Sequence, residues 1–288
     1  MLYVTYTLNF LLMLALPFLL AAFLARRLGT RWGLVWVGAV TFIASQIVHI
    51  PLNAVLGRLG VLVPAKTGWP LVEYAVLLGL LAGVCEEMAR FLVLRFWLKR
   101  DRSWRAALMF GAGHGGAEAV ILGLLSAIGT INIFVLRNVN PAQLGVSAAR
   151  LPAVQAQIAA AWNVPALYPL LGAFERVSAI STHLFLAVLV MQVFTRNNKL
   201  WLLAAILWHA LIDGTAVYSA TTWGPYVTEG LIAAFALIGL ALLFALRQPE
   251  PPPVDAAPVS AAVPQPAGGG PLPETQATSD QLDRTRYQ

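Results

Sequence analysis

The chain has 288 residues, of which 59% are hydrophobic, and it carries only 19 Lys and Arg and 13 Asp and Glu. Soluble domains contain about 25% charged residues, so the 11% found here and a mean hydropathy of +0.73 exclude a water-soluble fold. The single cysteine, Cys85, excludes an internal disulfide, a zinc finger and Cys-x-x-Cys redox chemistry. A net charge of +6 does not indicate nucleic-acid binding, because the basic residues cluster at the ends of apolar stretches.

Seven apolar stretches are long enough to cross a bilayer, which requires about 20 apolar residues in a helix. They cover residues 4–25, 33–55, 69–98, 104–135, 166–195, 200–222 and 225–247. The first is expected to be an uncleaved anchor, because no basic residue precedes it and three arginines follow it. The sequence therefore predicts an all-α, polytopic transmembrane helical bundle of about seven spans, formed by residues 1–247.

Two segments lie outside these stretches. Residues 136–165 include QLGVSAARLPAVQAQIAAAW, whose spacing predicts either a short amphipathic helix on the membrane surface or an ordinary connector. Residues 248–288 are rich in Pro, Ala and Gly and hold nine of the 18 prolines. Such a composition buries too little apolar surface to order the chain, so we expect a disordered cytoplasmic tail.

The lysines and arginines also predict the orientation, because basic residues flanking spans favour the cytoplasm. Four lie on one side of the predicted bundle, namely Arg58, Lys66, Arg137 and Arg150. Ten lie on the other side, namely Arg26, Arg27, Arg31, Lys99, Arg100, Arg102, Arg105, Arg196, Lys199 and Arg247. We therefore expect a multi-pass protein of the cell membrane with its N-terminus outside and its C-terminus in the cytoplasm.

Ionisable side chains occur deep inside four of the predicted spans. A charge at the bilayer centre costs at least about 2.5–3.5 kcal/mol, so such residues are usually interior, paired and functional. They are Glu86, Glu87 and Arg90, then His114 and Glu118, then Glu175, Arg176 and His183, and finally His209 and Asp213. Counting from the cytoplasmic helix ends at about 1.5 Å per residue brings most of them to one layer, with Glu175 about two turns further out.

Spacing within the helices predicts which side chains share a face. Residues four apart project from the same side of a helix, which applies to Glu86 with Arg90, to His114 with Glu118, and to His209 with Asp213. Glycines surround His114 in the stretch FGAGHGG. Because small residues let transmembrane helices approach closely, we expect Glu86 to lie beside His114.

Two kinds of hydrolytic chemistry suit this set. A carboxylate beside an imidazole can hold and deprotonate a water, and a second histidine can bind the oxyanion that forms on a carbonyl. Alternatively, the histidines and carboxylates can bind Zn²⁺, which needs three protein ligands and an open position in a catalytic site. The candidate ligands for a metal are His114, His183 and His209.

Three blocks, EEMAR, FGAGH and HALID, resemble the Glu-Glu, Phe-x-x-x-His and His-x-x-x-Asn/Asp motifs of the CPBP-type intramembrane proteases. These include the type II CAAX prenyl endopeptidases and the PrsW relatives. The combination of EEMARFLVLRF, FGAGHGGAEA and ERVSAISTH is most similar to the bacterial YhfC family of glutamic-type intramembrane proteases. The similarity covers about residues 73–218, with the motifs in order.

The resemblance implies a role for each matching residue. Glu86 and His114 would activate the water, Glu87 would support them, and His209 with Asp213 would stabilise the oxyanion. Arg90 departs from the CAAX-type pattern, in which the basic residue stands one position later, and Asp213 replaces the more common Asn. The remaining supporting residues are Arg90, Glu118, Glu175 and His183.

The sequence therefore predicts an intramembrane endopeptidase that hydrolyses peptide bonds of a membrane protein or peptide at or near the cytoplasmic half of the lipid bilayer. We expect no cofactor for the glutamic-type mechanism, with Zn²⁺ as the alternative cofactor. Two other function classes fit the same polar residues. One is a proton- or ion-coupled transporter, against which the sequence shows no internal repeat, and the other is a non-catalytic membrane scaffold.

Overall fold

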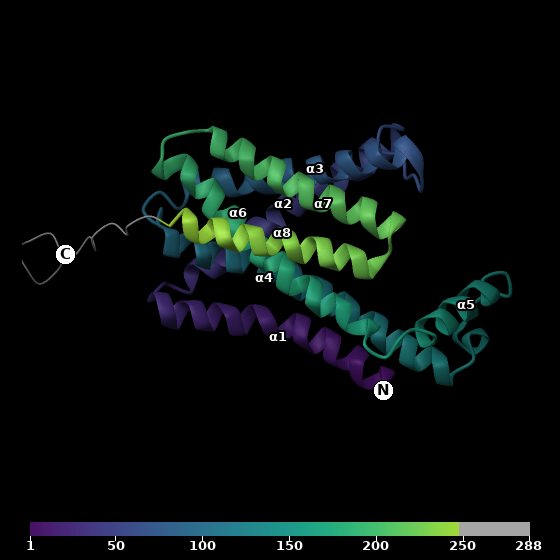
Figure 1. Cartoon of the computed structure of the whole chain (residues 1–288). Helices are drawn as coiled ribbons and strands as arrows, with labels where there is room; N and C mark the ends of the chain where they lie inside the picture. Colours follow the sequence, from purple (N-terminus) through teal and green to yellow (C-terminus); the bar gives the residue numbers. More distant parts are fainter. Residues whose placement is uncertain (248–288) are drawn as a thin grey trace, which may run out of the picture. The chain divides into compact units, whose positions relative to one another are not determined.

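The computed structural model describes residues 1–247, and within that range it contains helices and no strands. The predicted tail, residues 248–288, lies outside the described residues. The α-helices are α1 (Leu2–Leu28), α2 (Gly33–Arg58), α3 (Gly68–Phe96), α4 (Trp104–Asn138), α5 (Leu151–Trp162), α6 (Leu171–Thr195), α7 (Leu200–Thr222) and α8 (Pro225–Ala245) (Figure 1). Two 3₁₀ helices, η1 (Pro141–Leu144) and η2 (Tyr168–Leu170), flank α5.

Six of the described helices are long and apolar enough to cross a membrane: α1, α2, α4, α6 with its preceding 3₁₀ turn, α7 and α8. The seventh long helix, α3, has 29 residues, carries Glu86, Glu87 and Arg90, and packs most extensively against α7. These seven helices match the seven predicted stretches. The predictions of an all-α fold and of a multi-pass membrane protein are confirmed.

Glycines set the closest helix contacts, as the sequence predicted for the stretch around His114. At Gly113 of α4, a Cβ atom would lie 2.0 Å from the Val35 carbonyl oxygen of α2. At Gly79 of α3, it would lie 2.3 Å from the Ala210 carbonyl oxygen of α7. Only a residue without a side chain fits at such positions, which allows α2 to pack on α4 and α3 on α7.

Helix α6 lies at the centre of the bundle, because 78% of its most apolar 18-residue segment is buried. The apolar core lies at one end of the bundle, where the second half of α6 meets the C-terminal half of α3 and the first half of α4. Its fully buried members include Leu94, Phe110, Leu186 and Val188. The ionisable residues lie next to this core, on its side toward the opposite end of the bundle.

The segment between α4 and α6 contains the short helix that the sequence predicted as one of two possibilities. Helix α5 has 12 residues, none of them buried. It lies at the same end of the bundle as the N-terminus (Figure 1). The connector is therefore partly helical, and its contact with a membrane surface stays a prediction.

Candidate active site

Four helices bring carboxylates and imidazoles to one buried layer. Helix α3 supplies Glu86 and Glu87, while α4, α6 and α7 each supply one histidine. Their exposed fractions are 6% for Glu86, 0% for Glu87, 0% for His114, 5% for His183 and 4% for His209. The layer that was predicted from counts along single helices therefore forms, with its members facing one another across the bundle.

Glu86 lies at the centre of this layer. Its Oε2 atom is 3.0 Å from Nε2 of His114, which confirms the expected pair. The other oxygen, Oε1, accepts a hydrogen bond of 3.0 Å from Nε2 of Gln46 on α2. Both carboxylate oxygens are thus held, so the orientation of Glu86 is determined by two other helices.

Glu87 contacts Arg90 and His209 in the buried layer. It pairs with Arg90 three residues later, and its Oε1 atom accepts a hydrogen bond of 2.7 Å from Nδ1 of His209. The second ring nitrogen of His209, Nε2, lies 3.5 Å from Oδ2 of Asp213. The ring of His209 is therefore held between two carboxylates, one buried and one that is 42% exposed.

His183 has a partner at each ring nitrogen. A guanidinium can only donate hydrogen bonds. Because Nη2 of Arg90 lies 2.6 Å from Nδ1 of His183, Nδ1 must be the acceptor. The opposite nitrogen, Nε2, donates over 2.6 Å to Oε2 of Glu118. Glu118 also accepts a hydrogen bond of 2.7 Å from Arg176, which in turn contacts Glu175. Glu175 thus joins the site through this chain of ion pairs.

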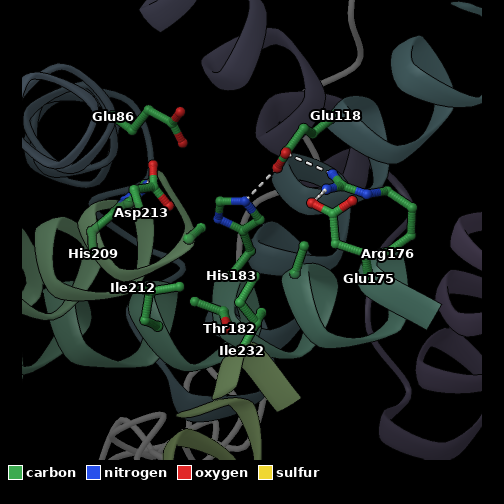
Figure 2. Close-up of a pocket in the computed structure, with 12 residues that line it drawn as sticks. Glu86, Glu118, Glu175, Arg176, Thr182, His183, His209, Ile212, Asp213 and Ile232 are labelled. Carbon is green, nitrogen blue, oxygen red and sulfur yellow. Dashed lines mark hydrogen bonds and ion pairs between the residues drawn. The ribbon is translucent and has the colours of Figure 1, made fainter. Parts of the chain in front are cut away.

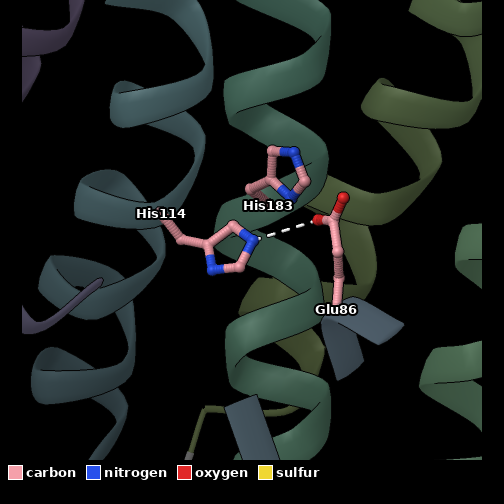
Figure 3. A group of neighbouring side chains, drawn as sticks. All are labelled: Glu86, His114 and His183. Atoms are coloured by element: carbon pink, nitrogen blue, oxygen red, sulfur yellow. Dashed lines mark hydrogen bonds and ion pairs between the residues drawn. The ribbon is translucent and has the colours of Figure 1, made fainter. Parts of the chain in front are cut away.

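Three of these residues form a group with the spacing of a metal site. One carboxylate oxygen of Glu86 and one nitrogen each of His114 and His183 all lie within 4.8 Å of one another (Figure 3). Glu and His are suitable ligands for Zn²⁺, and three of them leave a fourth position open. His209, also a predicted candidate ligand, is not part of this group.

Two further observations test the fit of a cation at this group. Ligating histidines usually donate their second nitrogen to a carboxylate, and His183 makes this contact with Glu118. In addition, the Arg90 guanidinium lies against His183 and 3.8 Å from Oε2 of Glu86, so a positive charge already occupies this position. A metal ion bound at Nδ1 of His183 would replace the Arg90 contact. The residues present therefore fit a divalent metal.

A cavity of about 100 Å³ adjoins the layer. Its wall includes Glu86, His183, His209 and Asp213. In Figure 2, His183 lies between the other three residues and the Glu118–Arg176 pair. A water needs roughly 10–15 Å³ of such space, so several can fit. The cavity can therefore hold both water and part of a substrate beside the candidate catalytic groups.

Sequence reasoning missed Gln46 and Asn53 of α2, and it interpreted His49 on the same helix as a satisfied or interfacial histidine. Gln46 contacts Glu86 directly. His49, one turn further along, interacts electrostatically with Glu86 and Asp213 and lies 3.0 Å from the Asn53 amide. The spacing of Gln46, His49 and Asn53 at i, i+3 and i+7 places them on one helical face, which was the available signal.

The fold and the site define a multi-pass membrane protein with a carboxylate–histidine centre buried among its helices. Residues 12–236 match the family described as "YhfC intramembrane metalloprotease", and the chain belongs to this family. The chain is similar to the "Uncharacterized membrane protein YhfC" of Bacillus subtilis (strain 168), with 33% identity over 208 residues. The alignment covers 70% of this chain and 79% of that relative. No solved structure matches at a significant level.

Proposed function

We propose that the protein is a metal-dependent intramembrane endopeptidase. The observation that carries this proposal is the group of Glu86, His114 and His183, which brings three suitable ligand atoms from three helices together in the bundle interior. The description of the family as a metalloprotease supports the same conclusion. Of the two cofactor possibilities raised by the sequence, the proposal adopts Zn²⁺.

In this proposal, Glu86, His114 and His183 hold the ion. A bound Zn²⁺ supplies Lewis-acid activation of water and of a carbonyl oxygen. Gln46 keeps the Glu86 carboxylate oriented through its 3.0 Å hydrogen bond. Glu118 keeps His183 in the tautomer whose Nδ1 carries a lone pair.

His209 and Asp213 act on the substrate in this proposal. Both line the cavity, and Glu87 fixes the His209 ring by accepting the hydrogen bond from Nδ1. This leaves Nε2 of His209, on the Asp213 side, to donate to the oxygen that becomes negative when water attacks the peptide carbonyl. Asp213 keeps this nitrogen protonated through its 3.5 Å approach. This is the oxyanion role that the resemblance implies for the pair.

The metal-free mechanism has an observation of its own. The 3.0 Å contact between Glu86 and His114 suits a pair that deprotonates a water without a metal ion. Both mechanisms need Glu86 and His114, and they differ in the need for His183 as a ligand. Metal content therefore separates them.

The test of the proposed activity is to map protein termini in membranes from cells that carry the wild-type protein or Glu86→Gln at equal abundance. We expect new termini, within or beside transmembrane segments of substrate proteins, only with the wild type. If the two membranes gave identical termini while the Glu86→Gln protein was folded, the assignment as a peptidase would be wrong. Transport assays would then test whether the site instead moves protons or ions.

Metal content gives a second prediction. We expect purified wild-type protein to retain roughly one zinc ion per chain, as in catalytic sites with three protein ligands, and His183→Gln to lose it. Mass spectrometry of the metal in both proteins measures this. The matched control is His49→Gln, because His49 is outside the three-residue ligand group. Full peptidase activity in metal-free wild type would establish the metal-free mechanism instead.

Glu118→Gln provides a third prediction. It removes the charge that pairs with Arg176 and the acceptor that orients His183. Loss of such a supporting carboxylate typically lowers metal affinity about 10–100-fold, and we expect a change of that size in a competition titration with a zinc chelator. An unchanged affinity would show that Glu118 does not support a metal ligand.

A further inference from the structure

We infer that the site opens toward the membrane face that carries the N-terminus and α5, and that its substrates are membrane-protein segments reaching it from that face. This inference rests on the proposed peptidase function and adds the side of the membrane from which water and peptide arrive. It follows from the distribution of polar and apolar side chains on the two sides of the buried layer.

Helix α6 shows the asymmetry most directly. On one side of His183, toward α5, the cavity wall includes Glu175, Arg176 and Ala179. On the other side, the helix continues into the apolar core, where Leu186 and Val188 have no exposed surface. Among the described residues, no α6 position after His183 lines the cavity.

The other helices repeat this arrangement. On α4, Glu118 lies one turn from His114 toward the α5 end and lines the cavity, whereas Phe110, one turn in the opposite direction, is fully buried. On α7, Asp213 lies one turn from His209 toward the α5 end and lines the cavity, whereas Ala205, one turn the other way, is fully buried. Three helices therefore have their polar lining on the same side of the layer.

The depth of the opening follows from α6. Glu175 precedes His183 by eight residues, which corresponds to roughly 12 Å along a helix. Over this distance, the Glu118–Arg176–Glu175 ion pairs form a polar wall (Figure 2). A peptide can keep its backbone groups solvated along such a wall, which it cannot do in lipid.

The basic residues indicate on which side of the membrane this face lies. Ten lysines and arginines flank the closed end of the bundle, which is the end filled by the apolar core. Four flank the end where α5 lies. By the positive-inside rule, the closed end faces the cytoplasm. The cavity therefore receives water and peptide from outside the cytoplasm, although Glu86 and His114 lie closer to the cytoplasmic ends of α3 and α4 than to their outer ends.

The charge of the cavity indicates a suitable probe. Its lining includes four carboxylates, on Glu86, Glu118, Glu175 and Asp213, and a single guanidinium, on Arg176. A small cationic reagent is therefore attracted into it. The chain's single cysteine can be removed as Cys85→Ala, which leaves a background without thiols.

The test uses two single-cysteine variants in this background, Ala179→Cys and Ala187→Cys. The two positions precede and follow His183 by four residues on α6, and Ala187 has no exposed surface. A membrane-impermeant, cationic methanethiosulfonate is added to spheroplasts. We expect the cysteine at 179 to react at least about tenfold faster than the one at 187, because thiols buried in apolar surroundings are inert.

Two results would overturn the inference. One is modification of the cysteine at 179 only in inverted vesicles, and the other is equal reactivity at 179 and 187. A second pair on α7, Ala216→Cys and Ala205→Cys, repeats the comparison in case one variant misfolds. Labelling of each unfolded variant in detergent verifies that its thiol can react. Because labelling does not require catalysis, repeating it with Glu86→Gln separates a wrong access route from a wrong peptidase assignment.

Discussion

Glu86→Gln is expected to lower the rate of peptide cleavage by a factor of about 10²–10⁴, because it removes one of the three proposed metal ligands and, in the metal-free mechanism, the acid–base group. The glutamine amide has nearly the same shape as the glutamate carboxylate, so the substituted side chain still packs among the helices. It has no negative charge to accept a proton from water or to hold a cation. The measurement is cleavage of a substrate identified by terminus mapping, with purified protein in lipid vesicles.

The matched control is Glu73→Gln, the same change on the same helix. Glu73 is exposed near the beginning of α3 and lies apart from the buried layer. We expect Glu73→Gln to retain wild-type activity and both proteins to unfold at similar temperatures. Equal activity of Glu86→Gln and Glu73→Gln would contradict the assignment of Glu86.

Gly113→Ala is expected to destabilise the bundle by about 1–3 kcal/mol or more, the range for overpacking in a filled core. The added methyl carbon would lie 2.0 Å from the carbonyl oxygen of Val35 and 2.6 Å from its carbonyl carbon. Both are backbone atoms, so relief requires α2 and α4 to separate. Because α2 carries Gln46 and α4 carries His114, we also expect weaker activity. Equilibrium unfolding in mixed micelles measures the change in stability.

Gly129→Ala is the matched control on α4. A Cβ atom at Gly129 meets no atom within 4 Å, so the substitution adds helix propensity without a clash. Alanine is favoured over glycine in a helix by about 1 kcal/mol, and we expect Gly129→Ala to be neutral or slightly stabilising. If both substitutions had the same effect, close packing at Gly113 would not be the cause.

The sequence by itself determined the helical architecture, because each span needs enough apolar residues to satisfy its backbone within the bilayer. That requirement acts within a single segment and is visible in single-sequence hydropathy. It also determined which ionisable residues lie deep, since depth depends only on position along a helix. The pairs at i, i+4, such as His209 with Asp213, follow from the same local geometry.

Only the tertiary structure decided which of these residues meet. His183 belongs to none of the three CPBP-type motifs, yet it joins Glu86 and His114, because the glycines of α4 let α6 approach. Gln46 was missed because it is uncharged, so a search for ionisable residues at membrane depth passes over its spacing with His49 and Asn53. The closed end of the bundle was also not predictable, because it depends on how α3, α4 and α6 interlock. Contacts between helices arise from packing that no single segment encodes.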